Sequence, residues 1–174
     1  MANAQENHIT VVESGLTFGA YHPGNCYLIE NSNGHRSLGD GFKMVEFTLL
    51  NEDGFYIVEA KSSIPRPSSK LEYEKYWQEI LEKMENALLL HAMAHVQRNT
   101  AAREELPENM ATIDWKTINI KLRLVIPSIP DSHLPPITDA FRQTVKKLKK
   151  MWGIQDINIA VLNEGKARKN NLIA

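Results

Sequence analysis

The chain has 174 residues, of which 43% are hydrophobic and 24% are charged. This length suits one domain with one core, and the composition excludes disordered, fibrous and collagen-like chains. The 20 Lys and Arg residues nearly balance the 21 Asp and Glu residues, which gives a formal charge of -1. The balance excludes a protein that coats nucleic acid through bulk positive charge, so any such contact needs a local basic patch.

Cys26 is the single cysteine, so it has no internal disulfide partner, and we expect it to be inert. Residues 1–8 lack the basic and apolar regions of a secretion signal. No run approaches the roughly 18 apolar residues that cross a bilayer. We therefore expect a cytoplasmic protein without a membrane segment.

Two β-branched runs open the chain, at residues 8–13 and 16–21, and the dipeptide Ser14-Gly15 separates them. Such runs around a turn signal predict an N-terminal hairpin within residues 1–22.

Residues 23–32 have an ambiguous sequence, Pro-Gly-Asn-Cys-Tyr-Leu-Ile-Glu-Asn-Ser. The apolar centre suits a strand, whereas the Pro-Gly-Asn opening suits a helix of two turns, and we favour the helix. Residues 42–50 and 55–62 are rich in β-formers, and Asn-Glu-Asp-Gly at 51–54 joins them. This pattern predicts a second hairpin.

A capping box at residues 69–72, Ser-Lys-Leu-Glu, precedes apolar residues at helical spacing, which predicts a long helix over 69–97. We expect a polar loop over residues 98–112. Apolar residues then alternate over 118–126, as in a strand with one buried face.

The last quarter has helical spacing over residues 131–152, with Gly153 placed where a helix ends. A buried strand is expected over 157–162 and a basic tail over 165–174. After the first hairpin the expected order is therefore α-β-β-α-β-α-β. We expect one α/β domain in which a mixed β-sheet is flanked by two long helices, with 127–174 appended to the core.

The strand at residues 55–62 is apolar on both faces at its start, as interior strands are. Glu59 and Lys61 lie two residues apart near its end and therefore share one face. Charge at such a position is costly unless it is paired or binds a metal. The pair is therefore a candidate functional site.

The turn decides which side chains face this pair. A four-residue loop at 51–54 would place Glu46 opposite Glu59, and a two-residue Asp53-Gly54 turn would place Glu46 opposite Lys61. A three-residue loop would send Glu46 to the other face.

Two carboxylates across a strand pair repel each other, and a hard divalent cation removes the conflict. Mg²⁺ favours one or two carboxylates plus water and phosphate oxygens, and Mn²⁺ is an alternative ion. Glu46 and Glu59 are thus candidate metal ligands. Lys61 could orient or deprotonate an attacking water and stabilise charge on a phosphate.

Three segments carry a resemblance to a known family: Val45-Glu46-Phe47, Gly54, and Ile57-Val58-Glu59-Ala60-Lys61-Ser62. Together they resemble the PD-(D/E)XK nuclease superfamily, whose signature is an acidic residue on the second core strand and Glu-x-Lys on the third. The resemblance implies a restriction-endonuclease-like αβββαβ core over residues 23–126.

The resemblance further implies a Mg²⁺- or Mn²⁺-dependent nuclease that hydrolyses phosphodiester bonds, with DNA preferred to RNA as partner and a homodimer as one possible assembly. Glu46 and Glu59 would bind the metal and Lys61 would assist the water. An acidic residue of the first core helix often joins them, which would be Glu30.

The chain departs from the family pattern in two ways. The first acidic residue is usually Asp, so Asp40 is an alternative to Glu46, and the Gln-x-x-x-Tyr motif of some subfamilies is absent because Glu82 follows Gln78. The whole chain also resembles a family of uncharacterised bacterial proteins with the same Glu-Phe, Glu-Ala-Lys and Val-Leu-Asn-Glu pattern.

The alternative function is an inactive nuclease-fold module that binds nucleic acid or serves as a partner subunit. A third is an ordinary α/β binding domain.

Three further groups invite a functional interpretation. His91 and His95 could bind a transition metal, although a polar helix stripe accounts for them better. A basic run with Arg142 could bind phosphates but is more typical of a solvated helix face. The tryptophans suit the core better than base stacking. With Arg142, the basic residues are Lys146, Lys147, Lys149, Lys150, Lys166, Arg168 and Lys169. The tryptophans are Trp77, Trp115 and Trp152.

Overall fold

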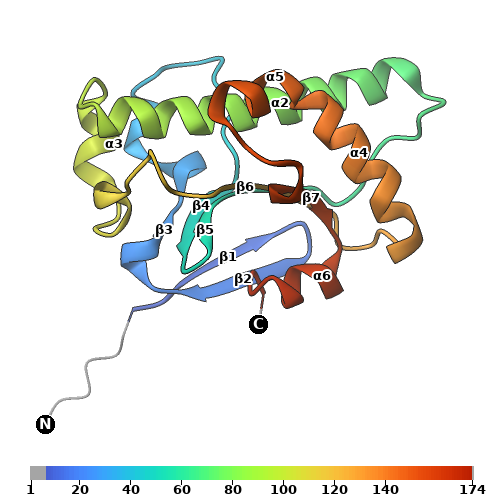
Figure 1. Ribbon diagram of the computed structural model, residues 1–174, viewed down its shortest axis with the longest axis horizontal. Coiled ribbons are helices and arrows are strands. Elements are labelled where there is room, and N and C mark those ends of the chain that lie inside the picture. Colours follow the sequence, from blue (N-terminus) through green and yellow to red (C-terminus); the bar gives the residue numbers. More distant parts are fainter. Residues whose placement is uncertain (1–6, 174) are drawn as a thin grey trace, which may run out of the picture.

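The computed structural model describes residues 7–173 and contains a five-stranded mixed sheet with a separate antiparallel pair (Figure 1). The pair is β1 (Ile9–Glu13) with β2 (Leu16–Tyr21), which confirms the N-terminal hairpin; residues 1–6 of that segment lie outside the described residues. The large sheet has the order β3 (Cys26–Tyr27), β4 (Phe47–Asn51), β5 (Gly54–Ala60), β6 (Ile120–Val125) and β7 (Ile159–Leu162).

The large sheet changes from antiparallel to parallel in its middle. Strands β3, β4 and β5 are antiparallel neighbours, whereas β6 runs parallel to β5 and β7 parallel to β6. The helices are α1 (Asn33–Arg36), α2 (Lys70–His95), α3 (Thr100–Glu105), α4 (Leu134–Thr144), α5 (Lys146–Trp152) and α6 (Glu164–Lys169). The expected α/β domain with a mixed sheet is confirmed.

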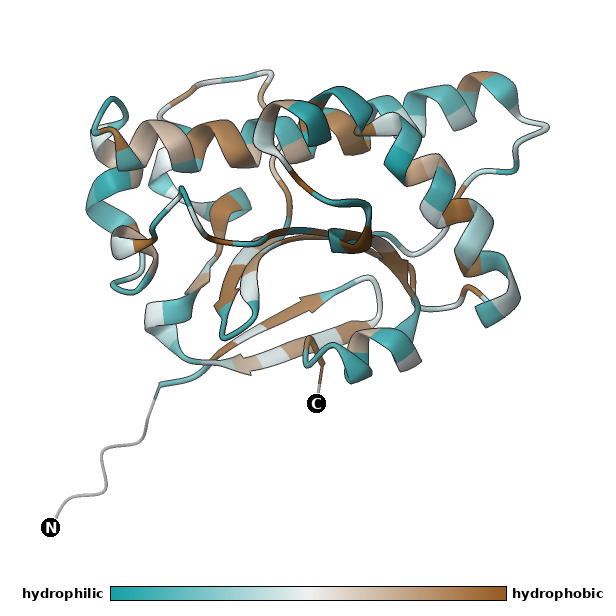
Figure 2. Cartoon of the chain, in the orientation of Figure 1, coloured by the Kyte–Doolittle hydropathy of each residue, from teal (hydrophilic) through white to brown (hydrophobic). Residues whose placement is uncertain are grey.

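The sheet is the middle layer of three. Helices α2, α4 and α5 cover one face, and the β1–β2 hairpin with α6 covers the other (Figure 1). Because both faces are covered, β5 is buried along its whole length, and hydrophobic residues predominate in the strands of the large sheet (Figure 2). Among the described residues, no helix is long and apolar enough to cross a membrane.

Two predictions in the first half of the chain were wrong. Residues 23–32 form no α-helix: the short strand β3 lies between two single 3-10 turns, Pro23–Asn25 and Ile29–Asn31. The strand expected from residue 42 begins only at Phe47, because β3 offers two residues for pairing and the preceding segment makes a loop.

Three predictions in the second half also need correction. The expected loop at 98–112 contains α3, which Asn99 caps by accepting a hydrogen bond from the Ala102 amide. The expected single helix is interrupted at Val145, where the Thr144 hydroxyl donates to the Ala140 carbonyl in a contact that bends helices. The expected basic tail contains α6, capped in the same way by Asn163.

Helix α2 and the C-terminal glycine agree closely with the sequence. The predicted helix 69–97 is observed as Lys70–His95. Gly153 adopts φ +64° after Trp152 and ends α5, as a C-terminal glycine is expected to do.

Candidate active site

The β4–β5 hairpin brings Glu46 and Glu59 together. Leu50 pairs with Phe55 and Phe47 with Val58, so the next position of this register sets Glu46 opposite Glu59. This is the first of the two expected registers, with the connection shortened to Glu52-Asp53 because Asn51 also pairs with Gly54.

Gly54 permits this tight connection. Its φ is +151°, and a Cβ atom built there would lie 2.4 Å from the Asn119 carbonyl oxygen of the segment before β6. Only glycine allows so close an approach of two backbones. The residue that fixes the register is therefore also packed against the neighbouring strand.

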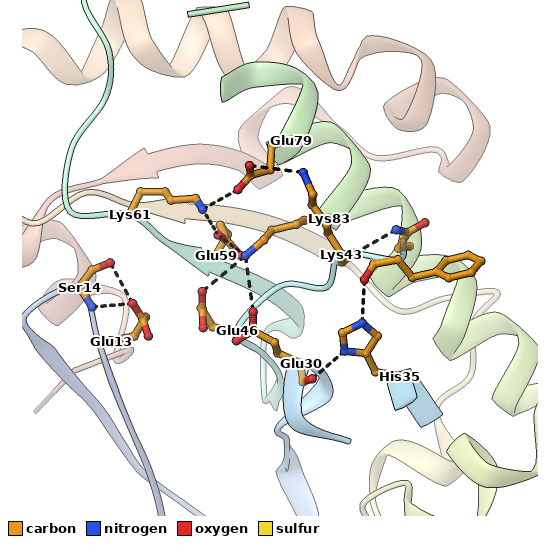
Figure 3. A network of polar contacts seen from close by, with 12 residues as sticks. Glu13, Ser14, Glu30, His35, Lys43, Glu46, Glu59, Lys61, Glu79 and Lys83 are labelled. Atoms are coloured by element: carbon orange, nitrogen blue, oxygen red, sulfur yellow. Dashed lines mark hydrogen bonds and ion pairs between the residues drawn. The ribbon is translucent and has the colours of Figure 1, made fainter. Parts of the chain in front are cut away.

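Strand β3 adds a third carboxylate. Tyr27 pairs with Thr48, so the turn after β3 runs beside the start of β4. Glu30 lies in that turn, Ile29–Asn31. Three strand ends thus deliver Glu30, Glu46 and Glu59 to one end of the sheet, on the side covered by α2 (Figure 3).

Lys83 of α2 points into the middle of these carboxylates (Figure 3). Its Nζ atom lies 2.8 Å from Glu59 Oε1, 3.7 Å from Glu46 Oε1 and 3.8 Å from Glu30 Oε1. The Lys83 side chain is only 9% exposed and that of Glu59 is 0% exposed. A buried ammonium therefore holds the three acidic groups together.

Lys61 forms the outer part of the same network. Its Nζ atom lies 3.3 Å from Glu59 Oε1 and 2.8 Å from Glu79 Oε1, which comes from α2 one turn before Lys83. Both ammonium groups thus contact a single oxygen of Glu59. The other oxygen, Oε2, is buried and has no hydrogen-bond partner among the described residues.

The network carries more negative than positive formal charge. Its ion pairs join five carboxylates to three ammonium groups: Glu30, Glu46, Glu59, Glu79 and Glu82 with Lys43, Lys61 and Lys83. A divalent cation would balance this excess. The donors are hard carboxylate oxygens, which favour Mg²⁺ or Mn²⁺ over softer transition metals.

The pKa values reflect this crowding. Burial, together with the nearby charges of Glu59 and Glu30, raises the pKa of Glu46 to about 8, against a smaller opposing effect of Lys83. Burial likewise raises the pKa of Glu59, although both lysines oppose it. The surroundings of Glu46 therefore favour its protonated form over its charged form.

The pKa values of Lys61 and Glu79 shift in the directions that favour the charged forms of both side chains. Burial lowers the pKa of Lys61, but its contacts with Glu79 and Glu59 together outweigh burial and raise that pKa above its usual range. The hydrogen bond from Lys61 lowers the pKa of Glu79. In this arrangement Lys61 remains an ammonium and cannot accept a proton from water.

The residues present fit a hard cation in chemistry, but they are not yet arranged around one. Within residues 7–173, no three His, Cys, Asp or Glu side chains are grouped so as to hold a metal ion. The Lys83 ammonium stands between the carboxylates and takes their negative charge. A cation would have to displace this ammonium and gather Glu46 with the unpaired oxygen of Glu59.

The structure places the other candidate residues away from this network. Asp40 is exposed in the loop before β4, and Cys26 is buried, which raises the pKa of its thiol to about 12. His91 is a core residue whose Nε2 lies 2.9 Å from Thr48 Oγ1, while His95 is exposed on the helix end. The tryptophans pack in the core against aromatic rings, as expected.

The basic run is partly engaged in internal ion pairs. Arg142 contacts Asp139 and Lys149 contacts Asp156, at 3.2 Å and 2.6 Å. These pairs reduce the positive charge that this face offers to a phosphate.

The sequence interpretation missed Lys83 and Glu79. A signal was present, because Lys83 lies three residues after Ile80 and four before Ala87, both of which are fully buried. A lysine on the apolar stripe of an amphipathic helix needs a buried anion, and Glu59 was the available one.

Comparison with family models, with curated proteins and with solved structures gives no significant match.

Proposed function

We propose that this protein is a Mg²⁺-dependent nuclease in which Glu46 and Glu59, assisted by Glu30, bind the metal. The observation that carries the proposal is the convergence of three carboxylates at one sheet end, where a fully buried Glu59 has one oxygen without a partner. Fixed acidic residues in the interior are costly, and such cost is typical of functional sites.

The element order supports the same proposal. The antiparallel strands β3, β4 and β5, the long helix α2 and the parallel strand β6 agree with the strand and helix order of the restriction-endonuclease-like core. One part differs: α1 follows β3, and no α-helix precedes it in residues 7–25. We propose that the core is of this kind, with its first helix reduced.

The chain's own residues then have separate roles. When bound, Mg²⁺ stabilises charge on phosphate oxygens and activates a water molecule. Lys61, kept charged by Glu79, orients that water and stabilises negative charge on the scissile phosphate. Lys83, whose ammonium lies at the same carboxylates, would supply a second positive charge at the site.

A cleavage assay tests this function. Labelled single- and double-stranded DNA and RNA are incubated with the protein in Mg²⁺ or in EDTA. We expect cleavage in Mg²⁺ alone and a loss of about 100-fold or more in Lys61→Ala, because Lys61 stabilises transition-state charge. Lys75→Ala, at an exposed lysine of α2, serves as control. Equal cleavage by Lys61→Ala and the control would refute the role of Lys61.

One observation favours the second candidate function, a nucleic-acid-binding or partner module without catalysis. Lys83 already pairs with Glu59 at 2.8 Å, so the most deeply buried carboxylate of the network has a cationic partner without a metal. Binding of nucleic acid that is unaffected by EDTA, with no cleavage of any substrate, would favour this candidate.

A further inference from the structure

An apolar cavity lies beside the candidate active site, at the carboxyl ends of β5 and β6. Its volume is about 400 Å³, which is in the range of small-molecule sites, about 300–1,000 Å³. Its walls come from the segment after β5, the first turns of α2 and α4, and the segment after β6. They include Ile64, Pro65, Pro67, Tyr73, Ile129 and Ile137. In sheets of this kind ligands bind outside the carboxyl ends of the strands, where the strand direction changes.

One face of α2 connects the cavity with the carboxylates. Tyr73, Tyr76, Glu79 and Lys83 follow each other at spacings of three or four residues and therefore share a face. The Tyr76 hydroxyl, between the two ends of this row, is buried and has no hydrogen-bond partner in the described part of the chain. At the other wall, Ile64 follows Lys61 by three residues, so their Cα atoms are at most about 11 Å apart. The cavity is thus within reach of a nucleotide next to one held at Lys61.

Two side chains at the cavity are free to bind an anion. Arg66 and His133 both line it, both are exposed, and neither side chain has a hydrogen bond or ion pair among residues 7–173. His133 also directly precedes α4, so it stands beside Pro136 and Ile137 of the cavity wall. The cavity therefore joins apolar walls to a rim that carries the Arg66 guanidinium and the His133 imidazole.

We propose that this cavity binds an unpaired nucleobase next to the scissile phosphate, so that the substrate is single-stranded or locally unpaired nucleic acid. This inference rests on the proposed function. A base offers a flat apolar face to the Tyr73 ring and the proline rings, and its phosphate lies at Arg66 and His133. Inside a duplex the base would be stacked and paired, and it could not enter.

The contacts of Tyr73 suit a stacking role. Its ring meets Trp77 edge to face at 6.0 Å, and Trp77 itself stacks on Phe141 of α4. The ring is thereby held by the core while Tyr73 remains half-buried at the cavity wall. A preset ring loses little conformational freedom on binding.

Fluorescence anisotropy tests the inference. The probe is a labelled single-stranded oligonucleotide in EDTA, compared with its duplex and with a version that carries abasic sites. We expect the intact single strand to bind tightest. Tyr73→Ala should weaken this binding about 5- to 150-fold, the range found for loss of one base–aromatic stack. Tyr73→Phe should keep the affinity.

Two further variants help to separate a loss of binding at the cavity from a general loss of folding. Ile137→Trp fills the cavity without removing the stacking ring and should also weaken binding of the single strand. Leu89→Ala, at a separate apolar cavity lined by Phe42 and Met44, is the matched control and should bind as the parent does. Unchanged affinity in both Tyr73→Ala and Ile137→Trp, or equal binding of the abasic strand, would overturn the inference.

Failure of the inference and failure of the proposed function give different results. Duplex cleavage in Mg²⁺ that is insensitive to Tyr73→Ala would overturn the base subsite and leave the nuclease. Tyr73-dependent binding without cleavage, and without metal binding at Glu59, would leave the subsite as part of a binding module.

Discussion

Replacing Lys83 with Met isolates the buried charge on which the site is built. The change keeps an unbranched side chain, one atom shorter than lysine, and removes the ammonium 2.8 Å from Glu59 Oε1. At that distance, with an effective dielectric constant of about 20, the attraction is about 6 kcal/mol, and desolvation of both ions opposes it. Removing one partner of a buried pair costs about 3–5 kcal/mol. In a chain of this size that loss lowers the melting temperature by about 6–20 °C.

The loss should depend on Glu59. Urea unfolding of Lys83→Met, Glu59→Gln and the double variant forms a double-mutant cycle. We expect the double variant to recover at least half of the stability that Lys83→Met loses, because no buried charge remains unpaired. The loss in Lys83→Met should also shrink as the pH falls, because burial raises the pKa of Glu59 and a protonated Glu59 needs no cationic partner.

Divalent cations should show whether the Lys83 ammonium occupies the place of a metal ion or only stabilises the fold. If the ammonium takes the place of a cation, Mg²⁺ should stabilise Lys83→Met more than the parent protein. A loss below about 1 kcal/mol in Lys83→Met, within the range of exposed ion pairs, would refute the buried arrangement.

Three other predictions concern pH and the turn. The pKa of Glu46 is raised from 4.5 to about 8, so between these pH values the folded chain keeps a proton that the unfolded chain has lost. The melting temperature should therefore fall as the pH rises from 4.5 to about 8. Glu46→Gln should flatten that fall. Burial lowers the pKa of His91 to about 3, so on acidification the unfolded chain takes up a proton before the folded chain does. The free energy of unfolding should therefore drop as the pH falls below about 6.5. An equally steep drop in His91→Gln would contradict this prediction. Gly54→Ala should cost about 1–3 kcal/mol in urea unfolding, because its Cβ would meet Asn119, and an unchanged midpoint would show that the turn relaxes freely.

The parts of the fold that the sequence predicted are those with strong periodicity. Helix α2 repeats apolar residues at helical spacing over seven turns, and the hairpin of β4 with β5 has a turn sequence between two β-rich runs. Short elements were missed because tertiary contacts define them. Strand β3 exists only through its pairing with β4, and α3 was hidden in a polar segment although Asn99 is a good N-cap.

The candidate site was half predictable. Alternation along β5 located Glu59 and Lys61, and the turn limited Glu46 to few registers. Lys83 comes from a helix more than 20 residues further along the chain, so no local pattern connected it with Glu59. Its position on the apolar stripe of α2 was the available clue, and only the packing of α2 on the sheet identifies its partner.

The proposed catalysis depends on metal binding at Glu46 and Glu59, and anomalous scattering from Mn²⁺-soaked crystals tests that binding most directly. Crystals of the parent protein and of Glu59→Gln are soaked under the same conditions. We expect a peak between Glu46 and Glu59 in the parent, with Lys83 Nζ moved away from Glu59 Oε1, and no peak in the variant. A parent structure without a peak, in which Lys83 still bridges the carboxylates, would contradict the metal site.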